Sequence, residues 1–588
     1  MAQTFYTAEE HFRVLIALLK AHNIRRIIVN PGTTNIAFAG SVQTDPYFEL
    51  YSEIDERSAG YIACGMAEES GEPVVLSCTG ATASRNYIPA LTEAYYRHLP
   101  VLAVTSSQHF GHIGSYTAQV IDRRPPEDCA KFSLNIPMFH DAHDRWAYTA
   151  KMNEAILELT HNGGGPVHLN MATEYTRDFS VKKLPDVKVI RRIDYGSESQ
   201  PEIHAKTVGI CIGSHAKFTQ ELTDLVDAFC EKYNGAVLCD HTSNYSGKYR
   251  IAPNFAGIHP RTNMDLLIHI GQVSGAYMPL NPKEVWRVNP DGAVRDTFRK
   301  LSYVFQMTEE EFFSRYVFHG GGGIHNNTDY YSGWRKDYDR LLGVLPELPF
   351  SNIWIAQNTI SKLPSGSVLH LGILNSLRSW NFFESPHDNI YAYCNTGGFG
   401  IDGCLSSLVG ASVASPEKLF FGVIGDLAFY YDINALGNRN IGRNLRVIMV
   451  NNGRGQEFRL YSHPAEAIFG KGADPFMAAA EHFAGQSRDF LRHYAENLGF
   501  EYLSASNKEE YLANLEHFTT PEMLDRPIFF EVFPNTKDES DALAAIGNAR
   551  ETKLLPASAR AKSAAKNAVK KLLGPAGITA VKRILGRG

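Results

Sequence analysis

The sequence has few cysteines and lacks long apolar runs. Its 588 residues include eight scattered cysteines and no Cys-x-x-Cys pair. This pattern predicts neither a disulfide framework nor a zinc site, and it favours buried free thiols in a reducing compartment. No stretch of about 18 uncharged apolar residues occurs, so we expect no transmembrane helix. The first residues lack the basic start and cleavage site of a signal peptide, which favours the cytoplasm.

Positive charge is scarce except near the C-terminus. The formal net charge of −6 does not suggest a nucleic-acid partner. From Thr552 to Gly588 there are nine Lys or Arg and no Asp or Glu, which leaves −15 (−6 minus 9) for the rest of the chain. Apolar residues recur there at helical spacing on both sides of Gly574-Pro575. We predict a basic helical tail (541–588) that can attach to the inner face of an anionic membrane. A solvated tail, or a helix docked on an acidic partner, is the alternative.

Short apolar runs alternate with helical segments along the whole chain. Thirteen such runs occur, at 25–32, 73–80, 99–107, 166–172, 207–215, 235–240, 264–272, 284–290, 367–373, 389–394, 418–426, 445–452 and 527–533. Runs that are apolar on both faces and separated by helices indicate parallel sheets and α/β architecture. One sheet rarely holds so many strands, so several α/β domains are expected.

Two breaks divide the chain into three units. The polar stretch Asp186–His204 ends an N-terminal unit at 1–185, and the glycine-rich run His319–Asp329 separates a middle unit at 200–318 from a C-terminal unit at 345–540. The four glycines in this run could instead approach a phosphate, but no Lys-Ser/Thr follows them as a P-loop requires. The fold class we predict is therefore α/β with three doubly wound parallel-sheet domains.

The strongest local pattern is GDLAFYYDINALGNRNIGRNLRVIMVNNGRG at residues 425–455. One apolar strand ends at Gly425-Asp426, and a second ends at Asn451-Asn452. In a parallel sheet both ends lie at the carboxyl edge, where α/β folds bind ligands. Asp426 and Asn452 would supply hard oxygen ligands, which suit Mg²⁺ beside a diphosphate. Each motif alone would be read as a turn; their spacing of 26 positions favours the metal.

This pattern resembles the diphosphate-and-magnesium motif of thiamine-diphosphate enzymes. The resemblance implies that Asp426, the Asn452 side chain and the Arg454 carbonyl bind the metal. It further implies cofactor contacts from Thr79, Gly80, Asn375, Ser376, Gly400, Ile401, Gly425, Asp426, Leu427, Ala428 and Asn452. In the segment YCNTGGFGIDGCLSSLVGAS (393–412), Ile401 would be the apolar wedge under the bent cofactor, and the Gly400 carbonyl would accept a bond from its 4′-amino group. The three units then become pyrimidine-binding, central Rossmann-like without flavin, and diphosphate-binding domains.

Glu56 is the predicted catalytic acid. It follows an apolar strand and precedes a Gly/Ala-rich helix in SEIDERSAGYIACGMAEESG. Thiamine chemistry needs one carboxyl group against N1′ of the aminopyrimidine, where it favours the imino tautomer. A glutamate at a helix start is more often a dipole-favoured cap. The surrounding sequence resembles the family and reverses that preference.

Most of the chain up to about 540 resembles the SEPHCHC synthase family (2-succinyl-5-enolpyruvyl-6-hydroxy-3-cyclohexene-1-carboxylate synthases). DERSAGYIACGMA, YIPALTEAYY, GFGIDG and IGDLAFYYDINAL carry the likeness. Gln119 matches the family's active-site glutamine, which would bond a developing alkoxide or enolamine. Three family arginines are absent, at Thr33-Thr34-Asn35, Ser106-Ser107-Gln108-His109 and Asn395-Thr396-Gly397. Because Arg–carboxylate pairs are geometrically specific, we expect neither isochorismate as acceptor nor 2-oxoglutarate as donor.

Other residues near the predicted site have open roles. Glu457, Phe458 and Arg459 stand where the family has mostly apolar substrate contacts, which suggests a more polar substrate or an exposed helix surface. Further pocket candidates, each of which could equally be structural, are His109, His112, Arg123, Arg124 and Arg378.

The predicted activity is decarboxylation of a 2-oxo acid with transfer of the carbanion to a carbonyl or alkene acceptor, using thiamine diphosphate and Mg²⁺. Carboligation is preferred by analogy with the family. A simple decarboxylase of the phosphonopyruvate or sulfopyruvate type is the alternative, and a non-catalytic scaffold is a third reading. The resemblance also implies a homodimer or homotetramer, because the family binds its cofactor between subunits.

Overall fold

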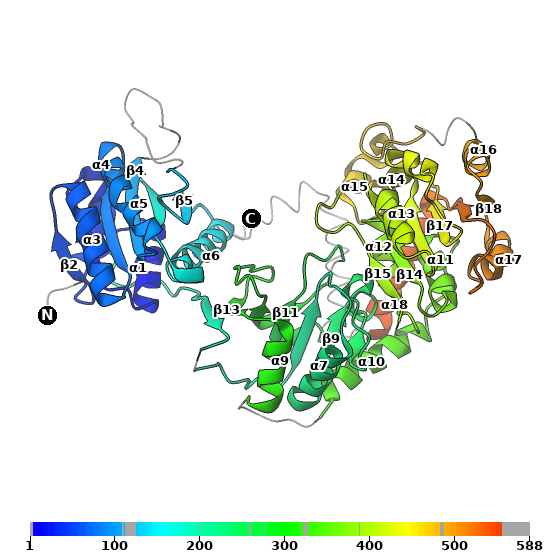
Figure 1. Ribbon diagram of the computed structural model, residues 1–588, viewed down its shortest axis with the longest axis horizontal. Coiled ribbons are helices and arrows are strands. Elements are labelled where there is room, and N and C mark those ends of the chain that lie inside the picture. Colours follow the sequence, from blue (N-terminus) through cyan, green and yellow to red (C-terminus); the bar gives the residue numbers. More distant parts are fainter. Residues whose placement is uncertain are drawn as a thin grey trace. The chain divides into compact units, whose positions relative to one another are not determined.

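The computed structural model describes residues 4–108, 111, 125–197, 199–257, 260–276, 278–320, 327–386, 389–482, 487 and 489–554 (Figure 1). Its contacts divide the chain into two compact units. The first comprises Met1–Gln200 and Val285–Thr308, and the second comprises Pro201–Glu284 and Glu309–Gly588.

The first unit contains a six-stranded parallel sheet in the order β2-β1-β3-β4-β6-β5. Its strands are β1 (Arg26–Val29), β2 (Glu49–Ser52), β3 (Val74–Thr79), β4 (Val101–Gln108), β5 (Phe132–Ile136) and β6 (Val167–Thr173). Its helices are α1 (Glu10–Ala21), η1 (Thr33–Asn35), α2 (Ile36–Val42), α3 (Glu56–Ser70), α4 (Thr82–Asn86), α5 (Ile88–Tyr96), α6 (Ala142–Glu158) and η3 (His161–Gly163).

Two apolar clusters form the core of this sheet. One joins it to α1, α2 and α6 through large side chains such as Phe12 and Ile156. The other joins it to α3 and α5 through small side chains such as Ala63 and Ala90. A Cβ atom on Gly60 would lie 2.6 Å from that of Ala90, so the Gly/Ala-rich sequence of α3 allows the close approach of α5.

The strands of the middle sheet belong partly to each unit. In the second unit β8 (Val208–Ile212), β9 (Gly235–Cys239), β10 (Arg250–Ile251) and β11 (Asn263–Ile270) run parallel in the order β10-β9-β8-β11. The strands β12 (Asn281–Val288), β13 (Leu301–Gln306) and β7 (Arg191–Asp194) are parallel in the order β12-β13-β7, and the division between the units falls within β12, at Val285. The helices here are α7 (Gln220–Tyr233), η4 (His241–Ser243), α8 (Pro253–Ala256), α9 (Glu309–Phe318) and α10 (Asp329–Leu342).

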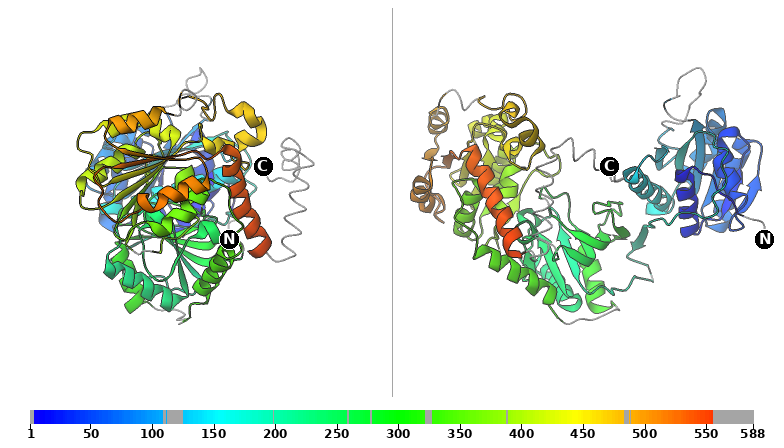
Figure 2. Two further views of the ribbon diagram at one scale, coloured as in Figure 1. Left: turned by 90° about the vertical axis from the view of Figure 1, so that its right-hand side faces the viewer. Right: turned by 180° about the vertical axis from the view of Figure 1, so that it is seen from behind.

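The second unit also holds a six-stranded parallel sheet in the order β15-β14-β16-β17-β19-β18. Its strands are β14 (Val368–Leu371), β15 (Tyr391–Tyr393), β16 (Phe420–Gly425), β17 (Leu445–Val450), β18 (Glu501–Ala505) and β19 (Ile528–Val532). Its helices are α11 (Asn352–Thr359), η5 (Ile360–Lys362), α12 (Asn375–Trp380), α13 (Cys404–Ala414), α14 (Asp426–Tyr431), η6 (Ile433–Gly437), η7 (Gln456–Arg459), α15 (Pro464–Phe469), η8 (Gly470–Ala473), α16 (Phe490–Asn497), α17 (Lys508–Phe518) and α18 (Thr536–Leu554). The long helix α18 packs on α10 and α11 (Figure 2).

The predicted fold class is confirmed, because all three sheets are parallel and flanked by helices. Each of the thirteen apolar runs overlaps a strand. The predicted tail boundary at 541 falls inside α18, and the basic residues after 554 lie outside the described part of the chain. Among the helices that the structure describes, none has the length and apolar character to cross a membrane.

Candidate active site

Asp426 lies at the carboxyl edge of the C-terminal sheet. β16 and β17 are parallel neighbours with Gly425 opposite Val450, so Asp426 and Asn452 both follow strand ends at this edge. The Asp426 side chain is only 3% exposed, and its carboxylate accepts bonds from the Leu427 amide at 2.7 Å and the Arg454 amide at 3.0 Å. Burial raises the pKa of Asp426 to about 7 despite these bonds. A buried carboxylate of this kind favours a bound cation.

Asn452 provides the second predicted metal ligand. Its Oδ1 atom is buried and has no hydrogen-bond partner among the described residues. A buried acceptor without a donor costs free energy unless a ligand completes it. No group of three or more His, Cys, Asp and Glu in the described chain could hold a metal. A site here therefore depends on the mixed set of carboxylate, amide and carbonyl oxygens, which fits Mg²⁺.

The loop after Asn452 is held by an ion-pair cluster. Arg454, whose carbonyl is the third predicted ligand, pairs with Asp474 at 2.8 Å. Asp474 also pairs with Arg459 at 2.5 Å, and Arg459 pairs with Glu466 at 2.6 Å. Arg459 is buried and supports the loop, so the exposed helix surface considered for it is wrong, while its role toward a substrate stays a prediction. Sequence reasoning missed Asp474, because no motif links it to the strand ends.

Further predicted cofactor contacts gather at the same edge. Asn375 and Ser376 begin α12 soon after β14, the other neighbour of β16. Leu427 and Ala428 lie in the first turn of α14. A Cβ atom on Gly425 would meet nothing within 4 Å, so a ligand can approach the backbone there.

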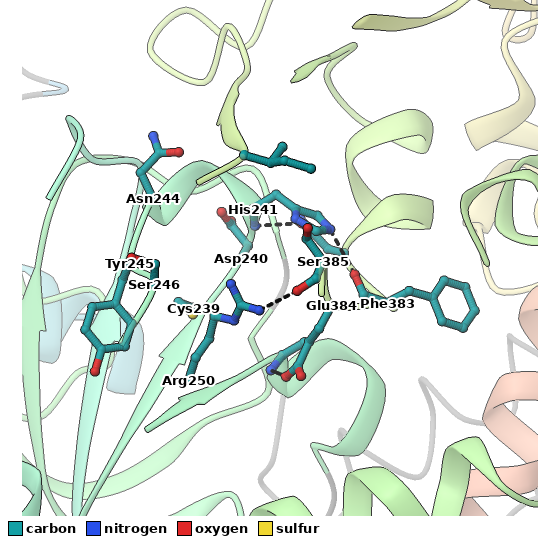
Figure 3. Close-up of a pocket in the computed structure, with 13 residues that line it drawn as sticks. Cys239, Asp240, His241, Asn244, Tyr245, Ser246, Arg250, Phe383, Glu384 and Ser385 are labelled. Carbon is teal, nitrogen blue, oxygen red and sulfur yellow. Dashed lines mark hydrogen bonds between the residues drawn. The ribbon is translucent and has the colours of Figure 1, made fainter. Parts of the chain in front are cut away.

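The end of α12 and the residues after it are fixed by contacts from η4 and β10. His241 Nε2 lies 3.1 Å from the Trp380 carbonyl oxygen and 2.9 Å from that of Phe383, and Figure 3 draws the second of these contacts. Since both partners only accept, Nε2 donates, and burial lowers the pKa of His241. Arg250 donates to the Ser385 carbonyl at 2.6 Å. The cavity among these residues is only about 40 Å³, so this region anchors α12 and has little room for a ligand.

Gly400 and Ile401 lie in the connection between β15 and α13. Ile401 is half-buried, and Phe399 before them has a positive φ of 55°. This strained backbone forms part of a sharp turn. The structure is compatible with the predicted wedge but does not bring a cofactor atom against it.

Glu56 lies at the carboxyl edge of the N-terminal sheet, as the first residue of α3. The cap of α3 is Asp55, which accepts bonds from the Arg57 and Ser58 amides at 2.9 and 3.4 Å. Capping therefore does not account for Glu56. Its half-buried carboxylate is 3.5 Å from the Asn86 amide nitrogen, so most of its bonding capacity remains available to a ligand.

Thr79 and Gly80 follow at the end of β3. The hydroxyl groups of Thr79 and Thr34 are hydrogen-bonded. A Cβ atom on Gly80 would lie 2.9 Å from the Ser107 hydroxyl and 3.1 Å from the Ser106 carbonyl, so only glycine fits there without movement.

Several predicted residues cannot be placed at either edge. Gln119, His109, His112, Arg123 and Arg124 lie outside the described residues. Arg378 is described and forms an ion pair with Glu457. Sequence reasoning also missed Glu539 of α18, whose carboxylate accepts a bond from the Asn352 amide at 3.0 Å and another from the Asn375 side chain. Burial raises the pKa of Glu539 to about 7.

The parallel sheets, the Asp426–Asn452 edge and the Glu56 edge together define the class of thiamine-diphosphate-dependent enzymes. Comparison with known proteins agrees. The family described as "Thiamine pyrophosphate enzyme, N-terminal TPP binding domain" matches residues 10–125.

Curated relatives give the narrower placement. The chain is 30% identical over 567 residues to the 2-succinyl-5-enolpyruvyl-6-hydroxy-3-cyclohexene-1-carboxylate synthase of Phocaeicola vulgatus, covering 92% of this chain and 98% of the relative. The synthases of Bacteroides thetaiotaomicron (30% over 568 residues, 92% and 98% covered) and Flavobacterium psychrophilum (27% over 551 residues, 89% and 96% covered) are also similar. The chain belongs to the family of these synthases.

Proposed function

We propose that this enzyme uses thiamine diphosphate and Mg²⁺ to decarboxylate a 2-oxo acid and to transfer the remaining acyl carbon to an acceptor. The observation that carries the proposal is the buried Asn452 Oδ1 atom, which has no hydrogen-bond partner in the described chain and stands at the same sheet edge as the buried Asp426 carboxylate. These two oxygens are suited to a divalent cation that neutralises a diphosphate.

The residues of the chain would divide the chemistry between two edges. Asp426, Asn452 and the Arg454 carbonyl would hold the metal, and Asp474 keeps Arg454 in place. When bound, thiamine diphosphate supplies a carbon nucleophile and accepts the electrons that carbon dioxide leaves behind. The Glu56 carboxyl would hold a proton at N1′ of the aminopyrimidine, a role that suits its half-buried position at a helix start.

Transfer to an acceptor is supported by the printed names of the relatives, which are synthases. A different substrate is supported by residues beside the site. Thr34, which stands near the position of a family arginine, is bonded to Thr79 at the β3 edge. A hydroxyl group there offers no charge to a carboxylate.

An oligomer is supported by apolar side chains around both edges. Ile54, two residues before Glu56, is 80% exposed, and Phe476, two residues after Asp474, is 93% exposed. Exposed apolar groups beside a site indicate a protein interface. We propose a homodimer or homotetramer in which subunits complete each other's sites.

The test is a panel of 2-oxo acids given to the purified protein with thiamine diphosphate and Mg²⁺. We expect carbon dioxide from one acid, and a two-substrate adduct when aldehydes or ketones are added. If free aldehyde were the only product, the proposed reaction would be simple decarboxylation and not carboligation. Tight cofactor binding without carbon dioxide from any acid–acceptor pair would contradict the proposal.

A further inference from the structure

A cavity of about 470 Å³ lies within the second unit, beside the outer face of α12. It is enclosed by α11, α18, the segment that begins with η7, α8 and the connection between β11 and β12. Apolar side chains, including Met278, Leu460 and Leu543, form part of its wall. The cavity is large enough for a small organic molecule.

This cavity adjoins the predicted cofactor edge but is separate from the metal ligands. Asn375 lines it, whereas Asp426 and Asn452 do not. Two carboxyl groups, those of Glu457 and Glu539, line it as well. Because the metal ligands do not line the cavity, a diphosphate held through the metal would lie outside it, which leaves the cavity to a substrate.

The cavity contains acceptors that call for a donor. Glu457 is paired through one oxygen with Arg378, while its Oε2 atom is buried without a hydrogen-bond partner among the described residues. Asn254 is 9% exposed, and its Oδ1 atom likewise has no partner within the described chain. Both residues line the cavity, and a small rotation of either side chain would present its buried oxygen to a hydroxyl group of a ligand.

The cavity also contains a cation with a neutral partner. Arg550 of α18 donates from Nη1 to the backbone carbonyl of Asn254 at 2.8 Å. In the part of the chain that the structure describes, no carboxylate lies within ion-pair distance of it. Burial lowers the pKa of Arg550, because less water solvates its charge. An anionic group of a ligand would relieve this cost with charge-assisted bonds.

We propose that this cavity binds the acceptor substrate, and that the acceptor is a small hydroxylated anion, either a sugar phosphate or a sugar acid. Arg550 would bind the phosphate or carboxylate, and the oxygens of Asn254 and Glu457 would accept bonds from hydroxyl groups. The inference rests on the proposed function, because an acceptor is needed only if the enzyme transfers its acyl carbon. The binding chemistry is independent of that reaction.

Isothermal titration of the full chain, with and without Mg²⁺ and thiamine diphosphate, tests this. The probes are glucose 6-phosphate, glucuronate, glucose, succinate and inorganic phosphate. We expect one of the first two to bind at least about tenfold more tightly than glucose, which lacks the anion, and than succinate and phosphate, which lack the hydroxyl groups. The stronger of the two identifies the anion as phosphate or carboxylate.

Variants locate the binding. Arg550→Gln should lower the affinity for the hydroxylated anion by about tenfold or more, while Arg550→Lys should keep part of that affinity. Lys537→Gln, an exposed cation on the same helix, is the matched control and should have no effect. Asn254→Ala should reduce the preference for glucose 6-phosphate or glucuronate over succinate. Thermal melting of each variant reports whether it folds.

Equal or undetectable binding of all probes would overturn the inference while leaving the proposed function intact. So would binding that Arg550→Gln leaves unchanged. Failure of the protein to bind thiamine diphosphate in the same titrations would overturn the proposed function, and the probe titrations without cofactor would still decide the chemistry of the cavity.

Discussion

The N-terminal and C-terminal sheets have one strand order but different residues at their strand ends. Reading each sheet from its own first strand, both follow the order second, first, third, fourth, sixth, fifth, and both are wholly parallel. The third strand ends in Thr79-Gly80 in one sheet and in Gly425-Asp426 in the other. The second strand is followed by Glu56 in the first sheet and by the Cys394–Gly403 loop in the second.

The comparison shows that a parallel sheet places ligands at its carboxyl edge, and that the residues after the strand ends decide which ligand binds there. Parallel strands bring their carboxyl ends together in both sheets. Only the C-terminal edge combines a buried carboxylate with a buried amide oxygen that has no partner among the described residues. Only the N-terminal edge presents a half-buried glutamate that no cap requires. A repeated architecture thus supports two different tasks.

The largest expected effect is at the N-terminal edge. Glu56→Gln should lower turnover by about 10²- to 10⁴-fold, because an amide cannot exchange the proton that acid–base catalysis needs. Carbon dioxide release measures turnover, and titration should show thiamine diphosphate still bound. Glu69→Gln, an exposed change on the same helix, should leave turnover unchanged. Equal activity of both variants would remove Glu56 from the mechanism.

Substitutions at the C-terminal edge should lower the affinity for the metal and the cofactor. Asp426→Asn and Asn452→Ala should each weaken Mg²⁺ binding by about tenfold to a hundredfold, with a matching loss of cofactor affinity, because each removes a hard oxygen ligand. Chelation of the metal should reproduce the loss in the unmodified protein. Glu417→Gln, an exposed acid just before β16, serves as control. Unchanged metal affinity in both variants would move the metal site elsewhere.

Each unit also contains a further buried carboxyl group whose pKa burial raises, Glu9 in the first and Glu539 in the second. The folded-state pKa of about 7 for Glu539 lies above the unfolded value, so its protonated form stabilises the fold at low pH and this stability is lost as pH rises through about 7. Two hydrogen bonds, from Asn352 and Asn375, oppose the rise, and the charges of Asp538 and Asp426 add to it.

The stability advantage of Glu539→Gln over the unmodified protein should therefore grow by about 2 kcal/mol as the pH rises from about 5.5 to about 8.5. Glu9→Gln should gain less, because the carboxylate of Glu9 accepts three hydrogen bonds that favour its charged form. Chemical denaturation at several pH values measures the difference. A gain for Glu539→Gln that does not depend on pH would show that Glu539 titrates normally.

The smallest expected effect is a difference in stability between alanine substitutions of two glycines at equivalent strand ends. Gly80→Ala should destabilise the fold by about 1–3 kcal/mol, because its Cβ would crowd Ser107 and the Ser106 carbonyl. Gly425→Ala should leave stability within about 0.5 kcal/mol, since its Cβ meets nothing. Gly425→Ala should instead weaken cofactor binding. Similar denaturation midpoints for the two variants would contradict this contrast.

Most of the strands that no apolar run marked stand at sheet edges, although the edge strand β15 was predicted. β2, β5, β7, β10 and β18 all stand at the edge of their strand order. A strand before Glu56 was expected, but the expectation that it is apolar is wrong, because all four residues of β2 are exposed. An edge strand packs against one neighbour only and needs less apolar sequence than a central strand. β13 was also missed, although it has neighbours on both sides.

By itself, the sequence determined the parallel α/β architecture and the polar residues at two strand ends. It could do so because a central parallel strand is apolar on both faces and its carboxyl end meets its neighbour's, so Asp426 and Asn452 follow from local pattern alone. Only the tertiary structure decided the support around them. Asp474 reaches Arg454, Glu539 reaches Asn352 and Arg550 reaches Asn254 across long stretches of chain. Burial and pairing of such groups depend on how helices pack, which no local spacing encodes.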